Sequence, residues 1–410
     1  MFNDQSTTFD FVSFESFFHT EIRILRCMGL SYFNCVFSNK KETEKWWQKI
    51  TPLIGLIIMS LLISMEIMKI IQVISISITY AAGIFTAMLS GMLCMFKAVR
   101  CWTHRKELFD FLQQLKASWE SAYSNKFLTK DELDSARYSR SLRNYVMVLV
   151  FSLAFSYAYP VYVGIVKHFV YHPEEYFFTF SRIMYPVKYP FKINTFSKYF
   201  ACLFFEQVSE ILAIVYWLCG DILFIQLTTH VSIQCKVLIN RLNNFNKDNT
   251  SSEEENCQQL INIISQHNQL FLLCKWLQRF FSPIAFFVTL INGLNLCFSL
   301  YRVDQQISQG NWSHLIENTI HLVNVFGQTL LYCKQADMLT EKLGEVNNAI
   351  YCSNWIQLNK KLKLILLIMM RRAHKEYRFT VYGIITLNLA QFSKIVNTAM
   401  SYFTLLRSIG

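Results

Sequence analysis

The chain has 410 residues, of which 53% are hydrophobic, 16% aromatic and only 16% charged. This composition is too apolar for an ordinary soluble protein and is typical of a membrane protein. The net charge of +11 is explained by Lys and Arg residues that face anionic lipid at the membrane rim. Because no RNA- or DNA-binding motif accompanies that charge, we expect no nucleic-acid partner.

The first 45 residues are polar and aromatic and lack the pattern of a signal peptide. Seven apolar segments follow, each close to or longer than the about 20 residues that a helix needs to cross the hydrocarbon core. Some of the later segments contain charged side chains, which we expect to face the bundle interior. The sequence therefore predicts an all-α membrane protein with seven transmembrane helices. The segments are residues 50–68, 70–96, 144–166, 199–233, 280–301, 315–333 and 379–406.

Basic residues predict the orientation of these spans, since Lys and Arg accumulate on the cytoplasmic side. The N-terminal segment and alternate loops carry 28 of the 39 Lys and Arg residues, and the opposite loops carry 8. We therefore expect a cytoplasmic N-terminus and an extracellular C-terminus, the inverse of a G-protein-coupled receptor. In this orientation the glycosylation sequon at Asn311 is extracellular and the one at Asn249 is cytoplasmic.

The cytoplasmic connections contain predicted structure of their own. Residues 102–119 and 347–373 have the apolar spacing of amphipathic helices. The acidic, Asn-rich stretch 242–259 predicts a mobile loop. None of the twelve cysteines lies in an expected external loop and no zinc-type spacing occurs, so we expect no metal, and no cofactor is needed.

Small and polar residues recur along the last apolar segment at steps of three or four, which places them on one helix face. A polar stripe on a membrane helix faces water or other protein, so it either lines a pore or forms a helix-packing seam. Leu405 and Ile409 lie beside its outer end, where apolar side chains can close a pore by dewetting. The stripe consists of Thr386, Ala390, Ser393, Asn397, Ser401, Thr404 and Ser408.

Aromatic side chains gather in the outer halves of spans two, three and four, where they suit a pocket for a small apolar ligand. The cluster also has a purely structural interpretation, because Tyr forms interfacial belts and Phe fills bundle cores. Two helix faces in it combine aromatic and hydroxyl groups. They are Ile76, Thr79 and Tyr80 in span two, and Ser152, Phe155 and Tyr159 in span three.

Charged residues inside the spans are further candidates, because such residues are costly in a membrane and are commonly functional. Lys394 could face a pore or meet a carboxylate such as Asp221. Glu206 and Glu210, one turn apart, could tune a pocket or approach the external surface. The remaining polar pair, on one face of span six, is His321 and Asn324.

Other function classes find less support. The chain contains no H-E-x-x-H, G-x-S-x-G, P-loop or dinucleotide motif, so we expect no enzyme. A G-protein-coupled receptor would need basic loops on the opposite side and an Asn-Pro-x-x-Tyr in the last span, which contains no proline. A small-molecule transporter is a third possibility, although no internal repeat is visible.

The C-terminal region contains a Tyr-x-x-x-Trp motif from Tyr351 to Trp355, the basic segment KKLKLILLIMMRRA and the ending Ser-Tyr-Phe-Thr-Leu-Leu at 401–406. These features resemble the signature of insect odorant receptors. The related gustatory receptors carry Thr-Tyr, five apolar residues and Gln-Phe. Here Gln391 and Phe392 follow Tyr382 at a different spacing, so a gustatory-type channel is only the alternative.

The resemblance implies an odorant-gated, non-selective cation channel in the plasma membrane of a sensory-neuron dendrite. Such receptors are heterotetramers of an odorant-binding subunit and a shared co-receptor. The last helix lines the pore, and the cytoplasmic ends of spans four to seven hold the subunits together. A volatile ligand binds in the outer half among spans two, three, four and six. The compact stretch 242–259 favours the odorant-binding subunit.

The resemblance also implies positions for the gate and the pocket. The terminal Ser-Tyr-Phe places the apolar gate at Leu405 and Ile409, with Asn397, Ser401 and Ser408 along the pore. Asn397 stands where many relatives have a basic residue. By helix face, the pocket positions are Ile76, Thr79, Tyr80, Ser152, Phe155, Tyr159, Val208 and Leu212.

Four parts of the chain follow from these expectations. They are a cytoplasmic segment (1–48), spans one to six with the pocket in their outer half (49–333), a cytoplasmic anchor helix (334–378) and the pore-lining seventh span (379–410).

Overall fold

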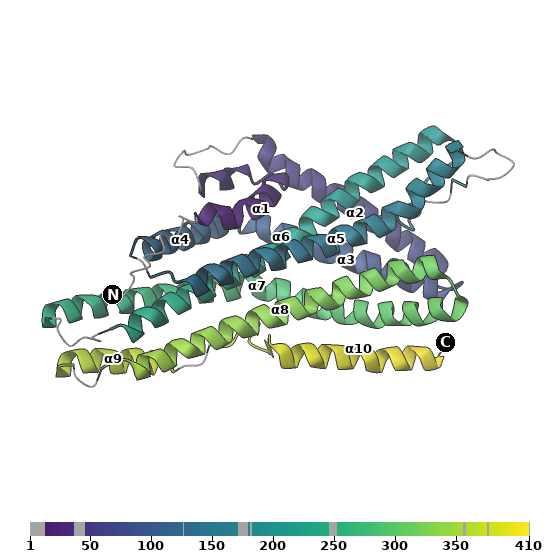
Figure 1. Cartoon of the computed structure of the whole chain (residues 1–410). Coiled ribbons are helices and arrows are strands. Elements are labelled where there is room, and N and C mark those ends of the chain that lie inside the picture. Colours follow the sequence, from purple (N-terminus) through teal and green to yellow (C-terminus); the bar gives the residue numbers. More distant parts are fainter. Residues whose placement is uncertain are drawn as a thin grey trace, which may run out of the picture.

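Long helices make up the fold, which a computed structural model describes for residues 13–36, 46–125, 127–170, 179–180, 183–245, 252–355, 358–374 and 377–409. The helices run side by side in an elongated bundle (Figure 1). The elements are α1 (Phe14–Cys27), the 3-10 helix η1 (Ser31–Val36), α2 (Trp46–Val73), α3 (Ile78–Thr103), α4 (Arg105–Ser124), α5 (Lys130–Val170), α6 (Phe196–Asn243), α7 (Glu253–Gln309), α8 (Trp312–Cys352), α9 (Lys360–Ala373), β1 (Thr380–Val381), β2 (Ile385–Thr386) and α10 (Leu389–Ile409).

Several helices are longer than a bilayer is thick. At about 1.5 Å per residue, the 57 residues of α7 span much more than the hydrocarbon core of about 30 Å, so part of this helix lies outside the membrane. Within the described residues, α2, α3, α5, α6 and α7 are long and apolar enough to cross a membrane. Helices α8 and α10 carry rows of polar side chains, which lower their hydropathy.

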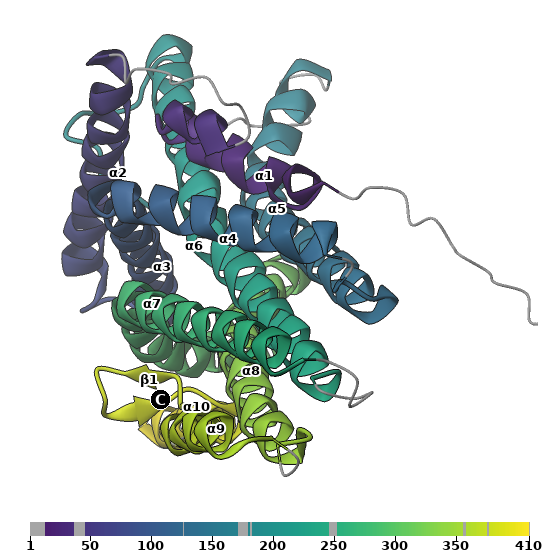
Figure 2. The same ribbon diagram turned by 90° about the vertical axis from the view of Figure 1, so that its left-hand side faces the viewer.

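Helix α6 is the central element of the bundle. All of its residues from Tyr216 to Cys235 are buried, whichever face they occupy. Figure 2 shows why, because α2 and α3 lie to one side of α6, α5 lies to the other, and α7 and α8 lie below. A helix enclosed on all sides can be apolar around its whole circumference, and a polar group on it is costly unless a neighbour supplies a hydrogen-bond partner.

The short helices α1 and α4 cross α6 in Figure 2, and both contact it. Apolar side chains of α4 face the bundle at the spacing predicted for 102–119, and Leu108, Leu112 and Leu115 are buried. Arg143 of α5 pairs with the buried Glu21 of α1 at 3.2 Å. The rings of α1 enclose His230 of α6, with Phe18 at 4.9 Å between ring centroids. This packing holds α1 against α5 and α6.

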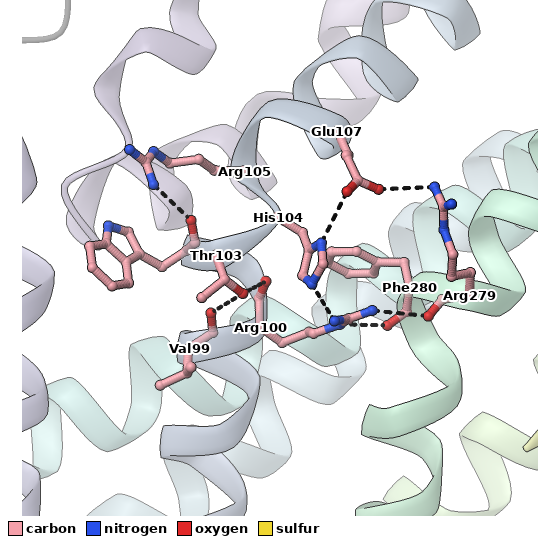
Figure 3. Close-up of polar contacts among 9 residues, drawn as sticks. Val99, Arg100, Thr103, His104, Arg105, Glu107, Arg279 and Phe280 are labelled. Atoms are coloured by element: carbon pink, nitrogen blue, oxygen red, sulfur yellow. Dashed lines mark hydrogen bonds and ion pairs between the residues drawn. The ribbon is translucent and has the colours of Figure 1, made fainter. Parts of the chain in front are cut away.

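Figure 3 shows how α3 and α4 are joined to α7 by polar contacts. Pro283 of α7 has no N–H to donate to the carbonyl four residues earlier, which belongs to Arg279. Arg100 of α3 supplies the missing donor, because its Nη2 donates to Arg279 O at 3.0 Å and its Nε to Phe280 O at 3.3 Å. Glu107 of α4 pairs with Arg279 Nη2 at 3.1 Å. A hydrogen bond with His104 helps to lower the pKa of the Glu107 carboxyl.

Three predicted boundaries are wrong. Residues 70–73 belong to the first span, because α2 continues to Val73. Ser77 caps the start of α3, since its side chain accepts a hydrogen bond from Tyr80 N. The predicted helix 347–373 is broken, since α8 ends at Cys352 and α9 begins at Lys360. The last helix begins at 389 instead of 379.

A hairpin explains the late start of α10. Thr380 pairs with Thr386 and Val381 pairs with Ile385 in two antiparallel strands. Gly383 in the turn has a φ of +72°, a conformation that glycine adopts at low cost. Thr386 therefore lies in β2 and is not part of the helical stripe. Asn249 and part of the predicted mobile loop lie outside the described residues.

Candidate functional site

Four helices and the connection between α5 and α6 enclose a cavity in the bundle. Each helix contributes four side chains at positions i, i+3, i+4 and i+7, which is the spacing of one helix face. Tyr185 of the connection and His321 of α8 complete the lining. The four stripes are Met59, Leu62, Ile63 and Glu66 on α2; Ala87, Ser90, Gly91 and Cys94 on α3; Val150, Leu153, Ala154 and Tyr157 on α5; and Glu210, Ala213, Ile214 and Trp217 on α6.

Small side chains leave this space open. Ala87, Gly91, Ala154 and Ala213 stand at lining positions where a larger residue would fill it. The centre of a water molecule could occupy a volume of about 80 Å³ within the cavity. One water needs about 10–15 Å³ of such volume. An apolar cavity with a few polar groups is the usual form of a small-molecule site.

Glu210 and His321 are the polar groups in the cavity that most need a partner. Both are buried. Neither carboxylate oxygen of Glu210 has a hydrogen-bond partner within the described chain, and the same holds for His321 Nε2. His321 Nδ1 lies 3.0 Å from Ser299 Oγ, so the ring is held while its other nitrogen stays available. A buried polar atom without a partner is costly. These atoms are therefore the ones in the cavity that are available to form hydrogen bonds with a ligand.

The segment 183–195, between α5 and α6, borders the cavity through Tyr185. Glu206 holds it, because one carboxylate oxygen accepts from Met184 N at 2.8 Å and the other from Tyr189 Oη at 2.7 Å. Tyr185 then stacks on Tyr157 of α5, with ring centroids 5.8 Å apart. Glu206 is therefore a structural acceptor, whereas Glu210, one turn further along α6, faces the cavity.

A buried polar network lies beyond the other end of the cavity. Asp221 of α6 accepts from Lys97 Nζ at 2.6 Å, from Tyr332 Oη at 2.8 Å and from Gln328 Nε2 at 2.6 Å. Asn292 of α7 donates to Gln328 Oε1 at 2.9 Å. The network thus joins α3, α6, α7 and α8 through one carboxylate.

Two features connect this network to the cavity wall. Lys97 Nζ lies 5.5 Å from the ring centroid of Trp217, which lines the cavity. Gly220 lets the lysine stem pass along α6, because a Cβ there would lie 2.9 Å from Lys97 Cδ. The sequence count places Lys97 with the cytoplasmic basic residues, and its burial with Asp221 shows that it is not a rim charge. The suggested pairing of Lys394 with Asp221 is wrong, since Lys97 is the partner and Lys394 is exposed.

Helix α10 packs along α7 and α8 through one apolar face (Figure 1). Ile395 and Ala399 are buried against Leu296 of α7 and Val325 of α8. The polar stripe lies on the opposite face, and its helical members from Ala390 onward are exposed along the whole length of α10. These are Ala390, Ser393, Asn397, Ser401, Thr404 and Ser408. Leu405 is also exposed, and Ile409 ends the helix with its side chain outside the described part.

Of the predicted ligand-binding residues whose side chains are described, His321 lines the cavity and the others lie elsewhere. Phe155 and Tyr159 are 66% and 55% exposed and contact each other on the outer face of α5. Ser152 donates to Leu149 O within the same helix. Large aromatic side chains are tolerated on a lipid-facing surface, so their abundance did not identify the inward face.

The remaining predicted positions lie near the turn between α2 and α3, on α6 and on α8. Ile76 and Tyr80 are exposed near the turn between α2 and α3, and the side chain of Thr79 lies outside the described part. Asn324 is buried and donates to Ile320 O. The half-buried members of the set are Val208 and Leu212 on α6.

The sequence reasoning missed Glu66, the small residues and the inward face of α5. Glu66 interrupts the otherwise uncharged stretch between Lys49 and Lys69, which is the signal that could have identified it. The stripes themselves were not detectable, because every membrane helix contains several sets at i, i+3, i+4 and i+7.

These features define an all-helical protein with membrane-competent helices and a small cavity among them, and solved structures show the same fold. The insect olfactory receptor OR5 from Machilis hrabei in complex with eugenol has the same fold, with a TM-score of 0.74, 16% identity and coverage of 96% of this chain and 100% of that one. The structure of the same receptor described without eugenol gives a TM-score of 0.71 at 15% identity.

The chain belongs to the insect odorant receptor family, since the sequence model of the 7tm odorant receptors matches residues 77–400. It is 26% identical to Odorant receptor 10 of Aedes albopictus over 45% of this chain and 49% of that protein. It is 23% identical to Odorant receptor 67c of Drosophila melanogaster over 48% of each. The chain thus spans about half the length of these two relatives. Odorant receptor 94a of Drosophila melanogaster is 20% identical over 82% and 83%. Family membership confirms that the chain is not an enzyme.

Proposed function

We propose that this chain is the odorant-binding subunit of a ligand-gated, non-selective cation channel. A small volatile molecule binds in the cavity among α2, α3, α5 and α6 and opens a pore lined by α10. The channel is a heterotetramer with an odorant co-receptor, and it lies in the plasma membrane of a sensory-neuron dendrite.

The exposed polar stripe of α10 is the observation that carries this proposal. Asn397, Ser401 and Ser408 face away from the helices that hold α10 in place. Polar groups on a membrane helix need water or another protein chain, and a helix packed on only one side has its other side available for a shared central pore. Leu405, exposed near the outer end, suits an apolar gate that dewets when closed.

In the proposed topology seven helices cross the membrane. Helices α8 and α10 cross the membrane together with the five more apolar helices, because their polar side chains face the bundle or the pore. The excess of Lys and Arg supports a cytoplasmic N-terminus, and in this orientation Asn311, just before α8, is an extracellular glycosylation site.

The cavity supports ligand gating through the network at its inner end. Trp217 lines the cavity and contacts Lys97, and the Asp221 network continues to α7 and α8. Those two helices hold α10 through Leu296 and Val325. A ligand that binds the open state more tightly shifts the population toward it, and Leu405 and Ile409 then withdraw from the axis.

Whole-cell recording with an odorant panel tests this proposal. Cells express the chain with an odorant co-receptor, the chain alone, or the co-receptor alone, and G-protein signalling is blocked in parallel cultures. The proposal expects odorant currents that require this chain and persist under the block. Second-messenger production without such currents would instead indicate a G-protein-coupled receptor.

A further inference from the structure

We propose that the cavity binds a small amine in its protonated form, with the ammonium group held by Glu210 and with Glu66 as the second acidic wall. The inference rests on the proposed function of this cavity and narrows its ligand from volatile molecules in general to one chemical class. The inference is based on the charged and polar side chains that line the cavity.

The described lining of the cavity contains two acidic residues and one base, His321, and the charge of Arg302 on α7 also acts on His321 and Tyr157. Glu66 of α2 and Glu210 of α6 both line it and are 2% and 3% exposed. No Lys or Arg is among the described residues that line it. Lys97, close to one end, is already paired with Asp221 at 2.6 Å. An isolated buried carboxylate is strongly unfavourable, so a cationic ligand would provide the missing partner.

The two carboxyl oxygens of Glu210, unpartnered among the described residues, favour a ligand that donates hydrogen bonds. Both oxygens of Glu210 lack a partner within the described chain, as does His321 Nε2. In the tautomer with the proton on Nδ1, toward Ser299, His321 Nε2 is an acceptor. A primary ammonium group has three N–H donors and no acceptor, which matches this set of acceptors.

Aromatic rings supply the rest of an ammonium site. Tyr157, Tyr185 and Trp217 line the same cavity, and the faces of such rings attract cations. Trp217 already has one cation on its ring, Lys97 Nζ at 5.5 Å from the centroid. The aliphatic stripes of α2 and α5 would take the hydrocarbon part of the ligand. An amine with a short apolar body therefore matches both the Glu210 carboxyl and the apolar lining of the cavity.

Matched ligand pairs test the inference. Each primary amine, from propylamine to 2-phenylethylamine, is compared with the alcohol of the same skeleton in cells that express this chain with a co-receptor. Charge-assisted hydrogen bonds are stronger than neutral ones, so at least one amine should be about tenfold or more potent than its alcohol. Equal or greater potency of the alcohol in every pair would overturn the inference.

Substitutions then assign the effect to its residue. Glu210→Gln should raise the half-maximal concentration of the amine about tenfold or more and leave that of the alcohol within about threefold. Glu210→Asp, which keeps the charge, should retain the preference for amines. Glu254→Gln, an exposed position at the start of α7, is the matched control and should change neither ligand. Equal shifts for amine and alcohol in Glu210→Gln would contradict the assignment.

Direct binding separates this inference from the proposed function. Radiolabelled 2-phenylethylamine and propylamine are bound to the detergent-solubilised chain, with surface labelling of each variant to confirm that it folds. Binding that Glu210→Gln removes, without any current, would support the amine site and count against the channel. Currents from neutral odorants without amine binding would preserve the channel and overturn the amine site.

Discussion

Lys97 and Asp221 form the most deeply buried ion pair among the described residues, with side chains that are 0% and 1% exposed. Two charges in such a place are favourable only with good geometry and further hydrogen bonds. Tyr332 and Gln328 provide those bonds at 2.8 and 2.6 Å. The pair therefore connects Trp217 in the cavity wall to α8, one of the two helices against which α10 packs.

Removal of one partner from this pair should destabilise the protein strongly. Lys97→Met leaves Asp221 as an uncompensated buried charge, and we expect a loss of about 3–5 kcal/mol in unfolding free energy. Thermal unfolding in detergent measures it. The double variant Lys97→Met/Asp221→Asn should recover part of the loss, because the two changes are coupled. Strictly additive losses would show that the two residues act independently.

Glu21 makes stability depend on pH. Burial raises the pKa of its carboxyl from 4.5 to about 7, although Arg143 opposes the shift. Because the folded form holds the proton more tightly than the unfolded chain, this stability is complete below pH 4.5 and is lost as the pH rises to about 7. The expected change is about 3 kcal/mol. Glu21→Gln should flatten the dependence of the unfolding temperature on pH in this window, and an unchanged slope would refute the assignment.

At the scale of elements, Arg100 repairs the interruption that Pro283 makes in α7. Arg100→Ala leaves the carbonyls of Arg279 and Phe280 without this donor and should cost about 1–3 kcal/mol in unfolding free energy. The cost should be smaller in a Pro283→Ala background, since an alanine has the backbone N–H that can donate to Arg279 O. Lys106→Ala, on the exposed side of α4, is the control. The same cost with and without the proline would show that Arg100 acts in another way.

The helices were more predictable than the side chains that line the cavity. Apolar length alone indicated the spans, and the apolar spacing of Leu108, Leu112 and Leu115 indicated α4. The start of α10 was not predictable in this way, since the hairpin before it is itself apolar. The inward face of α5 depended on Ala154, a residue whose importance lies in the space it leaves, and sequence periodicity does not report empty space.

At the scale of the molecule, the distribution of basic residues predicts the orientation even though some of them are buried. Lys97 and Arg143 are paired inside the fold. The positive-inside argument therefore rests on the other basic residues assigned to the cytoplasmic side of the membrane. An epitope tag at the N-terminus should therefore be detected only after cells are permeabilised, and a C-terminal tag in intact cells. Detection of the N-terminal tag in intact cells would reverse the topology.

The central claim is that α10 lines a pore that the ligand opens, and cysteine accessibility tests it most directly. Ser401→Cys places a thiol on the polar stripe. Tyr402→Cys places one on an exposed position toward the packed side of the same helix. We predict that an external, positively charged methanethiosulfonate reagent blocks the odorant current of Ser401→Cys irreversibly, and faster with odorant present, while Tyr402→Cys is spared. Equal effects on both variants, or no effect on Ser401→Cys, would contradict a pore along this stripe.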